Sequence, residues 1–158
     1  MSHFRIGHGY DIHRLQAGGV LMLGGVKVAE NISPIAHSDG DVVIHALVDA
    51  ILGACSKGDI GEHFPDSDPK WKGANSLRFL EAAMVIAHEN DWAIANADIT
   101  VLLEKPKLKP HKKAMVALLG KVLDSPVNLK AGTNEGLGEI GRGEAVAAHA
   151  VVLLVRAR

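Results

Sequence analysis

Residues 145–155 set the strongest limit on the fold. All of them are apolar except His149, and the run is well short of the roughly 20 residues that a membrane span needs. A nearly continuous apolar segment of this length is typical of a strand that is buried on both faces of a sheet. We therefore predict that Val146–Arg156 is a buried strand, and that other strands and helices of the chain cover it.

Strand and helix patterns alternate along the rest of the sequence. Alternating or continuous apolar residues predict strands at 4–8, 94–104 and 127–131, and a hairpin over 20–28 that turns at Gly24-Gly25. Apolar residues at helical spacing predict helices at 39–56, 76–90 and 112–123, the first of them capped by Ser38 or Asp39. The order indicates an α/β chain (α+β-like), a single domain over residues 1–158 with a mixed four- to five-stranded sheet packed on helices on one face.

Composition and charge exclude several classes of function. Seventeen Lys and Arg residues against eighteen Asp and Glu give a net charge of −1, without the basic excess of a generic nucleic-acid binder. Hydrophobic residues make up 47% of the chain, which is enough for a sizeable core. The single cysteine, Cys55, cannot form an internal disulfide. With no leader sequence visible, this favours a reducing compartment, and we expect a cytoplasmic protein that neither spans a membrane nor binds nucleic acid.

Three residues have the types and spacing of a metal site. Asp11 and His13 lie two apart in an extended segment, so they point to the same side, and His45 lies on the first helix. A carboxylate and two imidazoles would complete a zinc site with one open position. Asp41 or Asp49 could hold the other ring nitrogen of His45. Two other interpretations remain open here, an aspartate that only orients a histidine and a solvated helix face.

Four further segments could bind a phosphorylated ligand. His37 and Ser38 precede the first helix, whose free amides favour an anion. The loop 58–69 carries carboxylates for sugar or polyol hydroxyls, although turn chemistry alone explains its composition. The lysine-rich segment 105–113 could steer a phosphate or simply be a solvated loop. In the glycine-rich segment 131–144, Thr133 and Glu135 are plausible partners for phosphate and a hard cation, unless the segment is only a connection.

Taken together, these segments resemble one enzyme family over residues 4–156. The resemblance rests on motifs that occur in the family's order: Gly7-His8-Gly9-Tyr10-Asp11-Ile12-His13, His37-Ser38-Asp39-Gly40-Asp41, Gly58-Asp59-Ile60-Gly61, Phe64-Pro65-Asp66-Ser67-Asp68-Pro69, Lys105-Pro106-Lys107 and Gly141-Arg142-Gly143-Glu144. The family is that of the 2-C-methyl-D-erythritol 2,4-cyclodiphosphate synthases. It implies a metal-dependent phosphorus–oxygen lyase of the non-mevalonate isoprenoid pathway. Such an enzyme converts 4-diphosphocytidyl-2-C-methyl-D-erythritol 2-phosphate into the cyclic diphosphate and releases CMP.

The resemblance also assigns roles to residues of this chain. It implies Zn²⁺ on Asp11, His13 and His45, and Mg²⁺ or Mn²⁺ at Glu135, with His37 and Thr133 steadying the transition state. The residues that it implies for substrate binding are Ser38, Asp59, Ile60, Gly61, Phe64, Pro65, Asp66, Ser67, Asp68, Leu103, Pro106, Lys107, Leu108, Lys109, Ala131, Gly132, Asn134, Glu139 and Arg142. It further implies a homotrimer with active sites at the subunit interfaces.

Some positions depart from the family's pattern. Gly132 and Asn134 stand where many relatives have threonine, so the pocket has fewer hydroxyls here. Glu139 is acidic where relatives often have an aromatic or apolar residue, which argues against isoprenoid-diphosphate binding beside Arg142. Two alternatives to the lyase are a zinc-dependent phosphohydrolase, which would release inorganic phosphate, and a non-catalytic trimer that binds an isoprenoid diphosphate.

Overall fold

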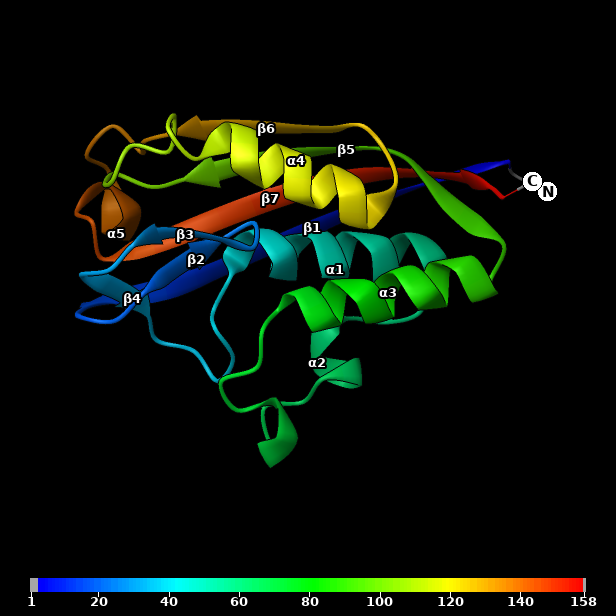
Figure 1. Cartoon of the computed structure of the whole chain (residues 1–158), viewed down its shortest axis with the longest axis horizontal. Helices are drawn as coiled ribbons and strands as arrows, with labels where there is room; N and C mark the ends of the chain where they lie inside the picture. The colour runs from blue at the N-terminus through cyan, green and yellow to red at the C-terminus, as the bar shows by residue number, and fades with distance from the viewer. Residues whose placement is uncertain (1–2, 158) are drawn as a thin grey trace.

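A mixed five-stranded sheet forms the centre of the computed structural model, which describes residues 3–157 (Figure 1). The strands lie in the order β4 (Ile32–Pro34), β1 (Phe4–Ala17), β7 (Ala145–Arg156), β5 (Trp92–Leu102) and β6 (Val127–Gly132). Neighbouring strands are antiparallel, except for the parallel pair β5 and β6. The predicted mixed sheet is therefore confirmed, with five strands.

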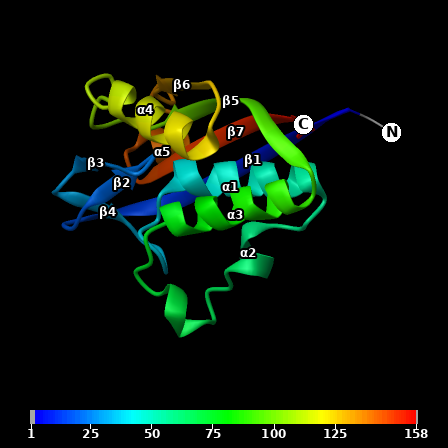
Figure 2. The same ribbon diagram turned by 45° about the vertical axis from the view of Figure 1, so that its right-hand side comes forward.

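Three long helices cover one face of this sheet. They are α1 (Val42–Cys55), α3 (Leu77–Glu89) and α4 (Lys112–Leu123), and α1 and α3 run side by side in both ribbon views (Figures 1 and 2). A separate hairpin of β2 (Leu21–Leu23) and β3 (Val26–Ala29) turns at Gly24 and Gly25, as predicted. Among the helices of the described residues, none has the length and apolar character needed to cross a bilayer.

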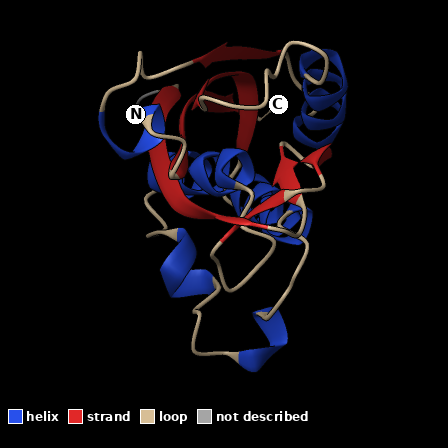
Figure 3. Ribbon diagram, turned by 90° about the vertical axis from the view of Figure 1, so that its left-hand side faces the viewer, coloured by secondary structure: helices blue, strands red, loops and turns tan. Residues whose placement is uncertain are grey.

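Three short helical turns complete the chain. α2 (Ile60–His63) and the 3₁₀ turn Pro69–Trp71 project from the body below α1 and α3, on the side away from the sheet (Figures 1 and 3). α5 (Gly138–Gly141) lies in the glycine-rich segment that leads into β7. The sequence did not predict these turns, because each is too short to show a helical period.

The first helix begins at a different residue from the one predicted. Its cap is Asp41, whose Oδ1 accepts hydrogen bonds from the amides of Val43 and Ile44, each at 3.1 Å. The prediction of Ser38 or Asp39 as the cap was wrong. Two of the amides expected to be free for an anion at this helix end are not free, because the Asp41 carboxylate accepts hydrogen bonds from them.

The predicted strand at 4–8 continues to Ala17, because β1 pairs with β7 over most of its length. The prediction that β7 is buried on both faces was only half right. Residues such as Val146, Ala148 and Ala150 are fully buried, but Val151 is 44% exposed. The reason is that the three long helices cover one face of the sheet, and the other face of β1 and β7 is largely bare in a single chain, except where Ala145 and Ala147 pack against Ile140 of α5.

Two glycines set the distance between β1 and α1. A Cβ atom at Gly7 would lie 1.8 Å from the carbonyl oxygen of Ala50, and one at Gly9 would lie 1.8 Å from that of Ala46. Real atoms do not approach so closely, so any side chain here would push the strand away from the helix backbone. The small residues on both elements are therefore required for this contact.

We expect Gly9→Ala to destabilise the fold strongly, and more than the about 1–3 kcal/mol that is usual for overpacking, since its neighbour is rigid helix backbone. Chemical denaturation monitored by circular dichroism measures the change. Gly53→Ala is the matched control, because Gly53 is an exposed residue of the same helix with no atom within 4 Å of an added Cβ. There the substitution is expected to stabilise the helix by up to about 1 kcal/mol. Equal stability of the two variants would contradict the packing argument.

Candidate active site

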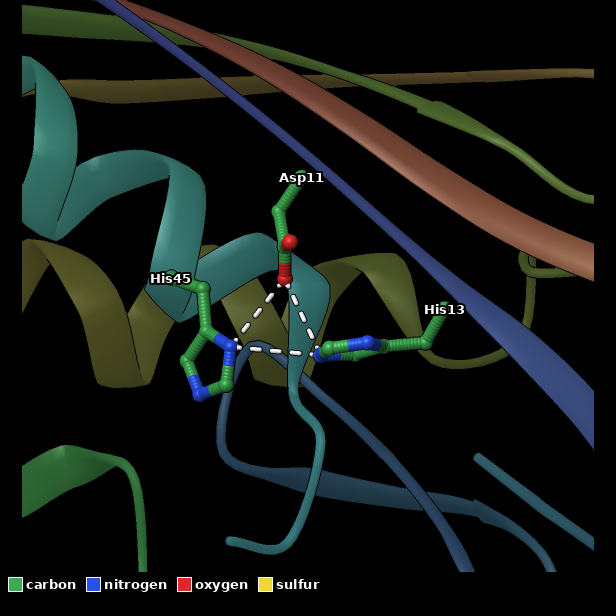
Figure 4. A group of neighbouring side chains, drawn as sticks. All are labelled: Asp11, His13 and His45. Carbon is green, nitrogen blue, oxygen red and sulfur yellow. Dashed lines mark hydrogen bonds and ion pairs between the residues drawn. The ribbon is translucent and has the colours of Figure 1, made fainter. Parts of the chain in front are cut away.

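Asp11, His13 and His45 converge on one point between β1 and α1 (Figure 4). Asp11 and His13 lie two residues apart on β1, so both side chains point toward the helices, and His45 lies on the first turn of α1. Asp11 Oδ2 is 3.0 Å from His45 Nδ1 and 3.2 Å from His13 Nε2, and the two ring nitrogens are 3.4 Å apart. The predicted three-residue cluster is therefore present.

The spacing of these three atoms fits a tetrahedral metal centre. Zinc ligands at about 2.0–2.1 Å from the ion lie roughly 3.3 Å from one another, close to the separations found here. One carboxylate and two imidazoles are also a donor set that zinc binds, and three protein ligands leave a position open for a substrate oxygen. The residues thus fit the ion that the sequence implies.

The surroundings of Asp11 keep its carboxylate ionised, as a metal ligand requires. Burial alone would raise the pKa of Asp11, but hydrogen bonds and charge from His13 and His45 outweigh it and hold that pKa well below its ordinary value. Burial would lower the pKa of His45, yet its hydrogen bond with Asp11 and that carboxylate's charge raise it. Asp11 is therefore ionised and available as a ligand at neutral pH.

Two acidic residues of α1 do not support His45 as predicted. Asp41 is fully buried, and besides capping α1 it accepts hydrogen bonds from the amides of Gly24 and Gly25 at 2.9 and 2.8 Å. It thereby fixes the β2–β3 turn to the start of the helix. Asp49 accepts from the amide of Ile60 at 2.8 Å and so anchors α2. The second nitrogen of His45, Nε2, instead faces Ser76 Oγ at 2.8 Å and Ser38 Oγ at 3.2 Å.

A pocket of about 500 Å³ opens beside the three ligands. It brings together seven of the residues predicted to bind substrate or act on it: His37, Ser38, Ile60, Gly61, Phe64, Pro65 and Asp66. The three candidate metal ligands line the same pocket. Segments 37–45 and 60–66, distant in sequence, therefore surround the proposed metal centre.

Three residues of the same predicted set shape the loop without lining this pocket. Asp59 caps α2 by accepting from the amide of Glu62 at 3.0 Å, and Asp68 accepts from the amide of Lys70 at 3.1 Å at the start of the 3₁₀ turn. Ser67 is exposed between them. Both aspartates thus serve the turn chemistry that the sequence left open for this loop.

A second pocket, of about 350 Å³, lies where β5 and β6 end and α4 begins. The residues that line it are Leu103, Pro106, Lys107, Leu108, Lys109, Lys112, Ala131, Gly132 and Thr133. All of them except Lys112 were predicted to bind substrate or to steady the transition state. The pocket combines apolar walls with lysine side chains, which suits a ligand that has a flat ring and a phosphate.

Like Asp59, Ser67 and Asp68, four other predicted residues lie outside both pockets. Glu135 is exposed in a left-handed backbone conformation, and the backbone N–H of Asn134 donates to Glu104 Oε1 at 2.7 Å. Arg142 binds Glu144 at 3.1 Å and lies 3.7 Å from Glu139, and the three form an exposed ion-pair group around α5. In the single chain these residues are not gathered with the candidate metal ligands.

Sequence reasoning missed several residues of the site. Trp71 and Phe79 line the first pocket and pack against Phe64, with ring centroids 5.2 and 4.6 Å away. Apolar residues of this kind give no chemical signature in a sequence. Lys112 was visible as part of the lysine-rich segment, and its position at the first residue of α4 could have placed it beside the pocket.

We expect Asp11→Ala and His45→Ala each to abolish stoichiometric zinc binding while the fold is retained, because two ligands no longer hold the ion tightly. Elemental analysis of the purified variants measures the zinc content, and circular dichroism checks the fold. His88→Ala, which changes an exposed histidine on α3, is the control and should keep the wild-type zinc content. Unchanged zinc in both ligand variants would disprove the assignment.

Comparisons with known proteins agree with this geometry. The model of the YgbB family matches residues 4–155. The 2-C-methyl-D-erythritol 2,4-cyclodiphosphate synthase of Pseudomonas syringae pv. syringae (strain B728a) is 50% identical, with 97% of this chain and 99% of the relative aligned. The synthase of Xanthomonas oryzae pv. oryzae (strain PXO99A) is 53% identical, over 98% of this chain and 96% of the relative.

A solved structure shows the same fold. IspF from Plasmodium falciparum, in a CDP complex, superposes with a TM-score of 0.87 at 35% identity and covers 100% of this chain and 99% of its own. Family model, curated relatives and solved structure thus agree over almost the whole length. The chain belongs to the YgbB family of 2-C-methyl-D-erythritol 2,4-cyclodiphosphate synthases.

Proposed function

We propose that this chain converts 4-diphosphocytidyl-2-C-methyl-D-erythritol 2-phosphate into 2-C-methyl-D-erythritol 2,4-cyclodiphosphate and CMP. The observation that carries the proposal is the convergence of Asp11, His13 and His45 at the wall of a pocket in a chain of this family. The enzyme would act in the non-mevalonate isoprenoid pathway. We place it in the cytoplasm, where its buried free Cys55 suits a reducing compartment.

The reaction is an intramolecular phosphoryl transfer. An oxygen of the 2-phosphate forms a bond to the β-phosphorus of the diphosphate, and the bond from that phosphorus to the bridging oxygen breaks, so that CMP leaves with the electron pair. Such a step needs correct positioning and neutralisation of charge more than a protein nucleophile. Cys55 is buried among core residues and plays no part in it.

Two cations fit this scheme. Asp11, His13 and His45 would hold Zn²⁺, which as a Lewis acid offsets the negative charge of the reacting phosphates. Glu135 would hold Mg²⁺ or Mn²⁺ together with phosphate oxygens of the substrate, a mixed ligand set that Mg²⁺ commonly takes. Glu135 is exposed and free to reach such a ligand.

The first pocket would hold the methylerythritol part of the substrate. His37 and Ser38 line the pocket beside the metal ligands, and we propose that they contact the reacting phosphate, with His37 steadying the transition state. Asp66 and the backbone of Ile60 and Gly61 would bind the hydroxyls. Phe64 and Pro65 would pack against the carbon chain, while Asp59, Ser67 and Asp68 hold the loop in place.

The second pocket would hold the CMP part. Leu103 and Leu108 are buried beside it, and Lys107, Lys109 and Lys112 supply positive charge for the phosphates. Pro106, Ala131 and Gly132 would contact the nucleoside, with Thr133 at the reacting phosphate. The Plasmodium falciparum relative in its CDP complex supports a cytidine nucleotide as ligand of this fold.

We propose only an indirect role for Glu139, Arg142 and Asn134. They lie in the segment between β6 and β7, near Glu135, and would shape the loop that meets the diphosphate. Because Arg142 is already paired with Glu144 and Glu139, we do not assign it an isoprenoid diphosphate.

We further propose that the active enzyme is a homotrimer. The two pockets share no lining residue, and the elements that carry them lie on opposite sides of the chain (Figure 1). In addition, Ile6, Tyr10, Ile12 and Val151 are 69, 46, 41 and 44% exposed on the bare face of the sheet. Contact between copies through this face would bury the apolar side chains and place the first pocket of one copy against the second pocket of another.

We expect phosphorus NMR to show cyclic diphosphate and CMP after incubation of the chain with its proposed substrate and Mg²⁺. A zinc chelator is expected to lower the rate by about a thousandfold or more, since a bound metal stabilises transition-state charge by several kcal/mol. Readdition of Zn²⁺ should restore the rate. Release of inorganic phosphate would instead indicate a phosphohydrolase, and zinc-dependent ligand binding without turnover would indicate a binding protein.

Mixing two inactive variants tests the shared sites. Asp11→Ala impairs the first pocket, and a Lys107→Ala/Thr133→Ala double variant impairs the second. After unfolding and refolding together, random assembly restores both halves in about one site of four, so we expect about a quarter of wild-type activity. The control is the same mixture without unfolding, which should stay inactive if subunits do not exchange. No recovery from co-refolded trimers would show that each site belongs to one chain.

A further inference from the structure

We propose that Ser76 and Asp39 are positioning residues that keep a proton on Nε2 of His45 and so leave its Nδ1 for the metal. This inference rests on the metal centre proposed above and concerns the hydrogen bonds to the ring nitrogen of His45 that faces away from that centre. Neither residue lines the pocket, and neither is among the three candidate ligands. Both act through His45.

The three residues form a continuous hydrogen-bonded chain. His45 Nε2 lies 2.8 Å from Ser76 Oγ, and Ser76 Oγ in turn donates a hydrogen bond to Asp39 Oδ1. The amide of Ser76 donates to the other oxygen of Asp39 at 3.0 Å. Ser76 is fully buried, immediately before α3, so solvent does not compete for its hydroxyl.

The direction of these hydrogen bonds follows from what each group can donate. An ionised carboxylate only accepts, so the single hydroxyl proton of Ser76 goes to Asp39. Ser76 Oγ then has only lone pairs left for His45, and the proton of that contact must sit on Nε2. In the metal-free site the ionised Asp11 accepts a hydrogen bond from Nδ1 of His45 at 3.0 Å. When a metal takes the place of that proton the imidazole is neutral, and because Nε2 keeps its proton, the lone pair left for the metal is on Nδ1.

The orientation of the ring agrees with this assignment. Figure 4 shows Nδ1 of His45 facing Asp11 and His13, with the second ring nitrogen on the side away from them. Asp39 also accepts from the amide of Asp41 at 3.2 Å, so its carboxylate is surrounded by donors and stays an acceptor. Ligand histidines in metal sites are commonly held by such a partner on the other nitrogen.

Ser38 is the other neighbour of His45 Nε2, at 3.2 Å, and its oxygen accepts from the amide of Gly40 at the same distance. It differs from Ser76 in two respects. Its side chain lines the pocket, and no carboxylate takes its hydroxyl proton in the described structure. The Ser38 hydroxyl is thus available to a ligand, while that of Ser76 is committed to Asp39.

Ser76→Ala, Asp39→Asn and the control Asn75→Ala test the proposal. Asn75 caps the same end of α3 through a 3.0 Å bond from the amide of Leu77, but it does not touch His45. Zinc affinity is measured by competition with a chromophoric chelator. We expect Ser76→Ala to weaken zinc binding by about 10- to 100-fold, as is usual when a partner of a ligand histidine is lost. Asn75→Ala should bind zinc as the wild type does.

Nitrogen-15 NMR of the histidine rings gives a readout that a purely structural role would not change. In the wild type and in Asn75→Ala we expect a slowly exchanging N–H signal at Nε2 of His45, in the metal-free and the zinc-loaded protein. Ser76→Ala should lose this protected signal. Asp39→Asn can donate its amide to Ser76, which allows the hydroxyl to turn toward Nε2, so we expect weaker zinc binding and a weaker Nε2–H signal.

Two results would overturn the proposal. One is a Ser76→Ala variant that is merely less stable, with wild-type zinc affinity and an unchanged Nε2–H signal, because the Ser76 hydroxyl would then only tie the start of α3 to Asp39. The other is a wild-type, metal-free protein without a proton at Nε2. Failure of the metal centre itself gives a different result: the wild type would bind no zinc, yet the protected Nε2–H signal would remain and would depend on Ser76.

Discussion

The close contact between β1 and α1 is the constraint on which the rest of the structure depends. Gly7 and Gly9 have no side chains, so the strand lies directly on the backbone of the helix at Ala46 and Ala50. Because a metal centre tolerates errors of only a few tenths of an ångström in its ligand positions, this contact matters for the candidate site as well as for the core. A strand held one methyl group farther away would separate Asp11 from His45.

Two aspartates at the start of α1 also fix the positions of the elements around the site. Asp41 and Asp39, two residues apart, each fix a different element to the start of α1: Asp41 binds the β2–β3 turn, and Asp39 binds Ser76 before α3. Asp41 is fully buried and Asp39 is half-buried, and each carboxylate accepts several hydrogen bonds, which offset part of the cost of removing it from water. These bonds restrict the conformation of the loop from 37 to 41. His37 and Ser38 owe their place in the pocket to these two aspartates.

The strands and helices with a regular hydrophobic period could be predicted, and so could the candidate metal ligands on them. Asp11 and His13 share a side because strand residues alternate, and His45 belongs to a helix whose apolar pattern is plain. Three features could not be predicted: Asp41 as the cap of α1, Ser76 as the hydrogen-bond partner of His45, and Trp71 as part of the pocket wall. Each depends on how a loop without a period folds back on a helix, and several aspartates near residue 40 satisfy the same sequence rule.

The bare face of the sheet and the two separate pockets have one physical origin. Helices on one face leave β1 and β7 half covered, with apolar residues such as Ile6 and Val151 in contact with water. The same layer of helices lies between the loop of α2 and the start of α4, and the two pockets of one chain share no lining residue (Figure 2). The association that we propose through the bare face would address both conditions at once. It would remove apolar surface from water, and it would build each phosphoryl-transfer site from two chains, which suits a reaction governed by positioning.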